Sequence, residues 1–168
     1  MAARTHRGAA TPAIQQLQRL KFPFQVHSFE IANTESTAGY GLQAATALGV
    51  PASAVFKTLI TFVDDRPCVG IVPVDHTLDL KALASALNAR RAVMAEVPVA
   101  ERLTGYVVGG ISPLGQRRKL TTVLDTSAQG HALIYVSAGR RGMDISLRPD
   151  DLLQATGGVL APIARQVG

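Results

Sequence analysis

A glycine-rich segment beside a basic cluster is the first part of the sequence with residues suited to chemistry. It reads GYVVGGISPLGQRRKL and runs from Gly105 to Leu120, with Gly109 and Gly110 near its centre. Glycines in such a segment allow positive φ angles or a close approach of the backbone to another group. These residues alone leave two interpretations open: a tight turn between strands, or a loop whose backbone amides face a ligand.

Lys57 is the second candidate for a chemical role. It follows the 21-residue uncharged stretch Ser36–Phe56 and opens the apolar run TLITFV. One interpretation is a lysine whose stem packs on a strand while its ammonium reaches water. The other is an ammonium held at the mouth of a pocket, where it binds an anion or a polarised carbonyl group.

Conventional metal and nucleophile motifs are absent from the sequence. The four histidines are scattered, and no HxxxH or CxxC spacing indicates a metal site. There is no Walker loop, dinucleotide-binding glycine motif or GxSxG elbow. Cys68 lies in the apolar run PCVGIV, where a buried thiol has a high pKa and little reactivity. A hydrolase with this sequence is therefore expected to work without a metal, a cofactor or a conventional protein nucleophile.

The composition fits one folded domain with an anionic partner. The chain has 168 residues, of which 47% are hydrophobic and 17% charged, which argues against a disordered tail or a coiled coil. Its net charge of +5 favours nucleic acid, an acidic lipid surface or a phosphorylated ligand. The lone cysteine and the absence of a secretory signal or an apolar span predict a cytoplasmic protein.

Hydrophobic periodicity and turn residues predict one α+β domain at residues 11–168, preceded by a flexible tail at residues 1–10. Thr11 and Pro12 predict a helix start, and KTLITFV and PCVGIVPV predict a hairpin around Asp64-Asp65-Arg66. Short strands linked by turns favour mixed or antiparallel pairing. Further strands are expected at residues 25–31, 121–125, 132–138 and 143–147, and further helices at residues 42–48, 78–90, 99–103 and 149–157.

Three ordered motifs resemble the YbaK family, free-standing Cys-tRNA(Pro) deacylases related to the editing domain of bacterial prolyl-tRNA synthetase. The motifs are FKTL at residues 56–59, TGYVVGGISPLGQRRK at 104–119 and YVSAGRRGMDISLRPDDL at 135–152. The resemblance covers residues 11–158 and includes the segments TPAIQQL and YGLQAA. It implies an α+β single domain with a mixed, largely antiparallel, barrel-like sheet surrounded by helices.

The resemblance also implies which residues form the site. The key polar residue of the family falls on Lys57, and its glycine pair falls on Gly109 and Gly110. These three are the candidate catalytic residues, and no metal ligand is implied. The candidate substrate-binding residues are Phe29, Tyr40, Thr58, Ile111, Ser112, Ser137 and Asp144.

The activity that the resemblance implies is hydrolysis of the ester that joins cysteine to mischarged tRNA(Pro). The glycine loop would stabilise negative charge on the carbonyl oxygen, and the thiol of the substrate itself would attack that carbonyl. The expected partners are aminoacylated tRNA and prolyl-tRNA synthetase, with no cofactor and no membrane. Two alternatives remain open: a deacylase for alanine or another small residue on tRNA(Pro), and a tRNA-binding relative without hydrolysis. A general RNA-binding domain is less favoured, because aromatic residues make up only 5% of the chain.

Overall fold

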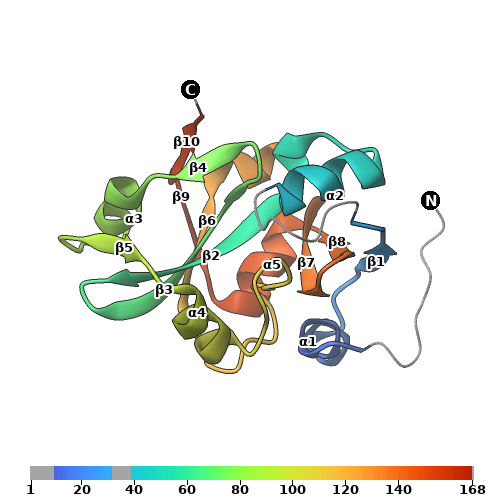
Figure 1. Ribbon diagram of the computed structural model, residues 1–168, viewed down its shortest axis with the longest axis horizontal. Helices are drawn as coiled ribbons and strands as arrows, with labels where there is room; N and C mark the ends of the chain where they lie inside the picture. The colour runs from blue at the N-terminus through green and yellow to red at the C-terminus, as the bar shows by residue number, and fades with distance from the viewer. Residues whose placement is uncertain (1–9, 32–38, 168) are drawn as a thin grey trace.

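The computed structural model describes residues 10–31 and 39–167, which form one α+β domain (Figure 1). Almost all of the tail predicted at residues 1–10 lies outside the described residues. Figure 1 shows α3 (Leu80–Ala86) and β5 (Ala92–Met94) at one end of the long axis, and α1 (Pro12–Leu20) and β1 (Gln25–Ser28) toward the other. None of the helices in the described part of the chain is long and apolar enough to cross a membrane.

Local sequence signals explain where the helices begin and end. The Thr11 hydroxyl accepts a hydrogen bond from the N–H of Ile14 and Pro12 occupies the first turn, so α1 starts where the sequence predicts. Asp79 caps α3 in the same way by accepting from the N–H of Ala82. The other helices are α2 (Tyr40–Leu48), α4 (Val97–Thr104) and α5 (Pro149–Thr156), each ending at a glycine with positive φ.

The largest sheet has five strands in the order β5-β2-β3-β6-β9. The predicted hairpin is present, because β2 (Phe56–Val63) pairs with β3 (Arg66–Pro73) in an antiparallel register through the turn at Asp64 and Asp65. β3 continues into parallel pairing with β6 (Thr121–Asp125), and β6 with β9 (Val159–Ala161). β2 therefore runs through the sheet with β3 on one side and the short β5 on the other.

Two smaller sheets complete the fold. β1, β8 (Met143–Leu147) and β7 (Ile134–Arg140) form an antiparallel sheet in the order β1-β8-β7. β4 (His76–Leu78) pairs with β10 (Ala164–Gln166), also antiparallel. Five of the seven strand pairings within the described residues are antiparallel, which confirms the predicted mixed, largely antiparallel character.

The sheets do not close into a barrel, so this part of the fold prediction was wrong. β7 approaches β2 through a single bridge between Val55 and Tyr135 instead of a continuous ladder. β5 pairs only with Thr61–Val63, which leaves Lys57–Leu59, between that bridge and β5, without a strand paired to it on that side. Barrel closure requires every strand to have two partners, and the strands at the ends of the two larger sheets, β5, β9, β1 and β7, have one each.

The sequence prediction also differs from the structure around the third helix. The helix expected at residues 78–90 is shorter, because Leu78 belongs to β4 and Asn88, with a φ of 55°, lies beyond the end of α3. The strand expected at residues 25–31 ends at Ser28. The strands β4, β9 and β10 have three residues each and were not predicted.

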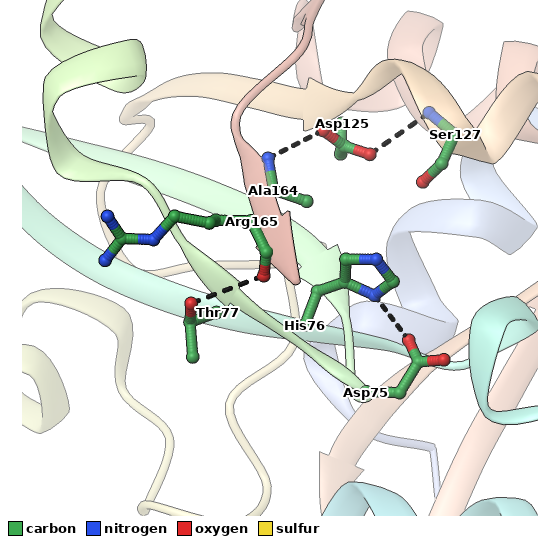
Figure 2. Close-up of polar contacts among 7 residues, drawn as sticks. All are labelled: Asp75, His76, Thr77, Asp125, Ser127, Ala164 and Arg165. Carbon is green, nitrogen blue, oxygen red and sulfur yellow. Dashed lines mark hydrogen bonds and ion pairs between the residues drawn. The ribbon is translucent and has the colours of Figure 1, made fainter. Parts of the chain in front are cut away.

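A buried carboxylate fixes the C-terminal strands to the sheet. Asp125 is 5% exposed and accepts hydrogen bonds from the N–H groups of Ile163 at 2.8 Å, Ala164 at 2.9 Å and Ser127 at 3.1 Å. Figure 2 shows the bonds from Ala164 and Ser127. Although burial alone would raise its pKa, these hydrogen bonds lower the pKa of Asp125 below its ordinary value. The same view shows Thr77 donating to the carbonyl of Arg165, which joins β4 to β10.

Candidate active site

A cavity of about 420 Å³ opens beside the unpaired half of β2. Its wall is built from the start of α2, the segment from β5 into α4, the glycine-rich loop after α4, and the strands β7 and β8. Eight of the ten predicted site residues line it: Phe29, Tyr40, Lys57, Thr58, Gly109, Ile111, Ser137 and Asp144. Segments from six parts of the chain are thus brought together around one space.

The edge of β2 faces this cavity between its two strand contacts on that side, the bridge at Val55 and the pairing with β5. The N–H of Val74 donates to the carbonyl of Val55, so the alternation of an antiparallel ladder turns the backbone of Thr58 away from β3. On that far side the pairing with the β5 segment ends at the hydrogen bond from the N–H of Ala95 to the carbonyl of Ile60, after which the chain turns into α4. The N–H and C=O of Thr58 consequently face the cavity with no partner strand among the described residues.

The side chain of Thr58 carries a second unpaired group. Its hydroxyl oxygen is buried and has no hydrogen-bond partner in the part of the chain that the structure describes. A buried polar atom without a hydrogen-bond partner lowers the stability of a fold by about 1–3 kcal/mol. Such atoms are therefore rare in native proteins and often mark a functional position. Because Thr58 lines the cavity, a bound molecule is the natural partner for this hydroxyl.

Lys57 is half-buried at the wall of the cavity. Burial lowers the pKa of its ammonium, and the carboxylate of Asp75 partly opposes that shift. Asp75 in turn contacts the ring of His76, with 2.7 Å between Oδ1 and Nδ1 (Figure 2). The pocket interpretation of Lys57 therefore agrees with its position.

The glycine loop is held in place by two charged side chains. The N–H of Val108 donates to the carboxylate of Glu101 on α4, at 2.9 Å, and its carbonyl accepts from Nε of Arg141 at 2.8 Å. Arg141 also lies over the ring of Tyr40, 5.3 Å from its centroid. The backbone that leads into Gly109 is thus fixed from both sides.

Gly109 stands where no other residue fits. Its φ is 89°, and a Cβ on it would lie 2.7 Å from Cε2 of Tyr40 and 2.9 Å from Nε of Arg141. Both the backbone conformation and the close approach require glycine here. Sequence reasoning found Gly109, but it did not foresee that Arg141 clamps the loop, because that contact depends on the turn between β7 and β8.

Gly110 and Ser112 do not line the cavity. The N–H of Gly110 donates to the carbonyl of Val107 at 2.9 Å and closes a turn. Ser112 is fully buried, and its hydroxyl accepts from the N–H of Leu114 at 3.2 Å. These two residues shape the loop from within, and of the predicted glycine pair Gly109 is the one that lines the cavity.

Ser137 and Asp144 face each other across the β7–β8 pair. The hydroxyl of Ser137 accepts from the N–H of Gly139 at 3.1 Å. Asp144 is 7% exposed, and burial raises its pKa to about 7. Near neutral pH this carboxyl is therefore present in substantial part as the neutral acid, which can donate a hydrogen bond into the cavity.

Other reactive groups stand apart from the cavity. Cys68 is buried, does not line the cavity, and has its pKa raised by burial. Among the described residues, no group of three or more His, Cys, Asp or Glu side chains is arranged to hold a metal ion. The cavity thus offers an ammonium, an open strand edge and a fixed glycine loop, which are groups that bind and polarise a carbonyl.

The fold is shared with proteins of known structure. A crystal structure provisionally described as a trans-editing enzyme for prolyl-tRNA synthetase superimposes with a TM-score of 0.81 and 22% sequence identity. The match covers 96% of this chain and 99% of that one. At this level of identity the likeness concerns the fold.

Sequence comparison defines the family. The model of the aminoacyl-tRNA editing domain matches residues 34–155. A protein of Enterococcus faecalis, provisionally named Cys-tRNA(Pro)/Cys-tRNA(Cys) deacylase EbsC, is 35% identical over 91% of this chain and 92% of its own length. A proline–tRNA ligase of Geobacter metallireducens is 38% identical over 51% of this chain, which corresponds to 15% of the ligase. The chain belongs to the aminoacyl-tRNA editing domain family, and its predicted membership of the YbaK-type editing enzymes is confirmed.

Proposed function

We propose that this protein hydrolyses the ester between cysteine and the terminal adenosine of mischarged Cys-tRNA(Pro). The observation that carries the proposal is that Lys57, the open edge at Thr58 and Gly109 surround one cavity. Its volume of about 420 Å³ falls within the ~300–1,000 Å³ of small-ligand sites, which suits an aminoacyl ester with its ribose. The similarity to EbsC over nearly the whole chain supports cysteine as the amino acid.

Charge stabilisation is the role we assign to the cavity wall. Negative charge develops on the carbonyl oxygen when an ester is attacked, and donors fixed in advance stabilise it without reorganisation. Lys57 positions the ester, while the backbone at Thr58 and Gly109 approaches the carbonyl and the ribose. Ser137 and Asp144 form the polar end of the cavity and orient the amino acid by hydrogen bonds.

We assign the nucleophile to the substrate. The cysteine sulfur attacks its own carbonyl carbon, the bond from that carbon to the ribose oxygen breaks, and the thiol proton passes to the ribose oxygen. Water then opens the resulting cyclic thioester and releases free cysteine. A thiol held next to its target has a large effective concentration, and no cysteine or histidine is among the described residues that line the cavity.

A deacylase for alanine is the second candidate. Phe29, Val97 and Ile111 give the cavity apolar wall area, and such a wall accepts a methyl group as readily as a thiol. Aminoacylated tRNA(Pro) as substrate, a complex with prolyl-tRNA synthetase and a cytoplasmic location belong to both versions of the proposal.

The test is deacylation of Cys-tRNA(Pro) by the purified protein and by Lys57→Ala. We expect wild-type turnover and a fall in kcat/KM of roughly 10²-fold or more in the variant, since Lys57 is assigned to the ester. Lys81→Ala is the matched control, because Lys81 is an exposed lysine on α3 outside the cavity. Equal activity of Lys57→Ala and wild type would contradict the role of Lys57, and tRNA binding without any deacylation would favour the non-hydrolytic alternative.

A further inference from the structure

A second groove, of about 340 Å³, lies between α1, the later part of the glycine loop and the end of α5. In contrast to the cavity, its lining is rich in polar side chains, and it includes three cations and no Asp or Glu. The cations and the amides beside them are Arg19, Arg118, Lys119, Gln15, Gln16 and Gln116. We call these residues and the space between them the basic groove.

The cations of the basic groove are not neutralised by carboxylates. Arg19, Arg118 and Lys119 are exposed, and within the described ranges no Lys or Arg forms an ion pair with Asp or Glu. Lys119 lies against the C-terminal end of α5, where a Cβ on Gly157 would be 3.5 Å from its Nζ. The carbonyl groups of a helix end orient an ammonium but carry only partial charge, so the groove keeps a net positive field.

The floor of the groove is rigid. Gln16 joins its three walls, because its Nε2 donates to the carbonyl of Ala155 on α5 at 3.0 Å and its Oε1 accepts from the N–H of Gly115 at 2.7 Å. Gly115 has a φ of 63°, and a Cβ there would lie 2.3 Å from the carbonyl carbon of Pro12. Arg118 and Lys119 therefore project from a loop whose backbone is fixed against α1.

One loop forms a wall of both the cavity and the basic groove. Ile111 lines the cavity and Pro113 lines the groove. Two peptide units separate them, so their Cα atoms are at most about 7.6 Å apart, twice the 3.8 Å between consecutive Cα atoms. The cavity and the groove are therefore adjacent, with one short stretch of loop between them.

We propose that the basic groove binds backbone phosphates of the acceptor end of the tRNA whose aminoacyl ester enters the cavity. This inference rests on the proposed function, since that function places an ester at the end of a polyanion. Uncompensated Arg and Lys side chains with neighbouring amides are the groups that contact phosphate oxygens without selecting a sequence. The groove thus holds the RNA in register, while the cavity selects the amino acid.

The direct test measures binding of an RNA minihelix that carries no amino acid and has the acceptor-stem sequence and 3′ end of tRNA(Pro). We expect the double variant Arg118→Ala/Lys119→Ala to bind about tenfold or more weakly at moderate salt. Its plot of log affinity against log salt is expected to be shallower by about 1.4–1.8, because each lost phosphate contact removes ~0.7–0.9 from the slope. Thermal unfolding of the variant is expected to match wild type, since both side chains are exposed.

The matched control is Arg90→Ala/Arg91→Ala. These two adjacent, exposed arginines come just before β5, near the end of the molecule opposite α1 in Figure 1, and do not line the basic groove. The control removes the same charge, so it separates local contacts from the general effect of net charge. Minihelix binding of the groove variant equal to that of this control would overturn the proposal.

Deacylation kinetics distinguish failure of the groove from failure of the proposed function. With Cys-tRNA(Pro), the groove variant is expected to raise KM about tenfold and to leave kcat within about twofold of wild type. If the wild-type protein is active and the groove variant has the same KM, the proposed role of the basic groove is contradicted and the proposed function is not. If no aminoacyl-tRNA is hydrolysed by wild type, the proposed function fails, and the minihelix measurement still decides whether RNA occupies the groove.

Discussion

At the scale of one residue, Thr58 lines the binding site and carries a buried, unpaired hydroxyl that lowers the stability of the fold. Its buried hydroxyl has no partner among the described residues, and its backbone faces an edge where β5 has already ended. Three residues further along β2, Thr61 is also buried, but its hydroxyl donates to the carbonyl of Cys68 at 2.9 Å. The two threonines have the same chemistry, and only the one at the cavity is left unsatisfied.

Replacing Thr58 by valine is expected to stabilise the fold and to impair the reaction. The substitution removes an unpaired buried hydroxyl, so the free energy of unfolding should rise by about 1 kcal/mol. The loss of one hydrogen bond to the substrate should lower kcat/KM for Cys-tRNA(Pro) about tenfold. Denaturant unfolding and deacylation rates measured on the same preparation check both effects.

Thr61→Val is the control for this prediction. Because it breaks an existing hydrogen bond, it should lower the free energy of unfolding by about 1 kcal/mol. It should leave kcat/KM close to wild type, since Thr61 does not line the cavity. If Thr58→Val is destabilising to the same degree, the hydroxyl of Thr58 is not an unsatisfied group kept for a ligand.

At the scale of elements, Asp125 decides whether the C-terminal strands stay on the sheet. β9 and β10 have three residues each, too few to be stable by themselves. The carboxylate of Asp125 accepts from the backbone N–H groups of Ile163, which lies between the two strands, and of Ala164, the first residue of β10. These hydrogen bonds to one buried side chain thereby fix the path of the chain between β9 and β10, which the local sequence does not specify.

Asp125→Asn is expected to lower the free energy of unfolding by about 1–3 kcal/mol near pH 7. An amide in place of Oδ2 turns an N–H donor toward the N–H of Ser127, and a buried donor is left without an acceptor. Asp64→Asn is the matched control. The Oδ1 of Asp64, which an asparagine keeps, accepts from the N–H groups of Arg90 and Arg91, and its Oδ2 accepts from Arg90 as well, but this side chain is exposed, so water can satisfy an amide placed there. That control should stay within about 0.5 kcal/mol of wild type.

The Asp125 prediction also has a definite pH dependence. The pKa of Asp125 is lowered in the folded protein, so its stabilising effect is present above the ordinary carboxyl pKa and is lost as pH falls through the lowered value. The difference in Tm between wild type and Asp125→Asn should therefore narrow from pH 7 toward pH 3 and below. A difference that widens on acidification would contradict the assigned role of the carboxylate.

Elements with local signals were predictable from the sequence. Thr11 and Pro12 located α1, and the two apolar runs around Asp64 located the β2–β3 hairpin. β4 and β10 were not predictable, because a three-residue strand is defined by its distant partner and not by its own residues. The sequence prediction placed Leu78 at the start of a helix, and only its pairing with Ala164 assigns it to a strand.

At the scale of the whole molecule, the candidate site exists because the sheet stays open. Lys57 and Gly109 could be located from the sequence, since each belongs to one of the three short motifs that resemble the family. The free backbone of Thr58 depends on the residue at which β5 ends, and the clamp by Arg141 depends on how the β7–β8 turn meets the glycine loop. These features come from long-range packing, which the pattern of one sequence does not specify.

The openness of the sheet also places the cavity and the basic groove on the same loop. Residues 109–111 reach toward the edge of β2 and residues 113–119 run along α1 and α5. A closed barrel would cover the edge of β2 with another strand. The predicted barrel was thus wrong, and the cavity lies at one of the edges that the sheets leave open.

The most direct test of the central claim is single-turnover deacylation of Cys-tRNA(Pro) beside Ser-tRNA(Pro) and Ala-tRNA(Pro). Serine replaces only the sulfur by oxygen, so it separates a need for the thiol from a need for size. If the substrate's own thiol is the nucleophile, Cys-tRNA(Pro) should be hydrolysed at least about 10²-fold faster than the other two. Comparable rates for the cysteine and alanine esters would contradict thiol assistance and assign the attack to water.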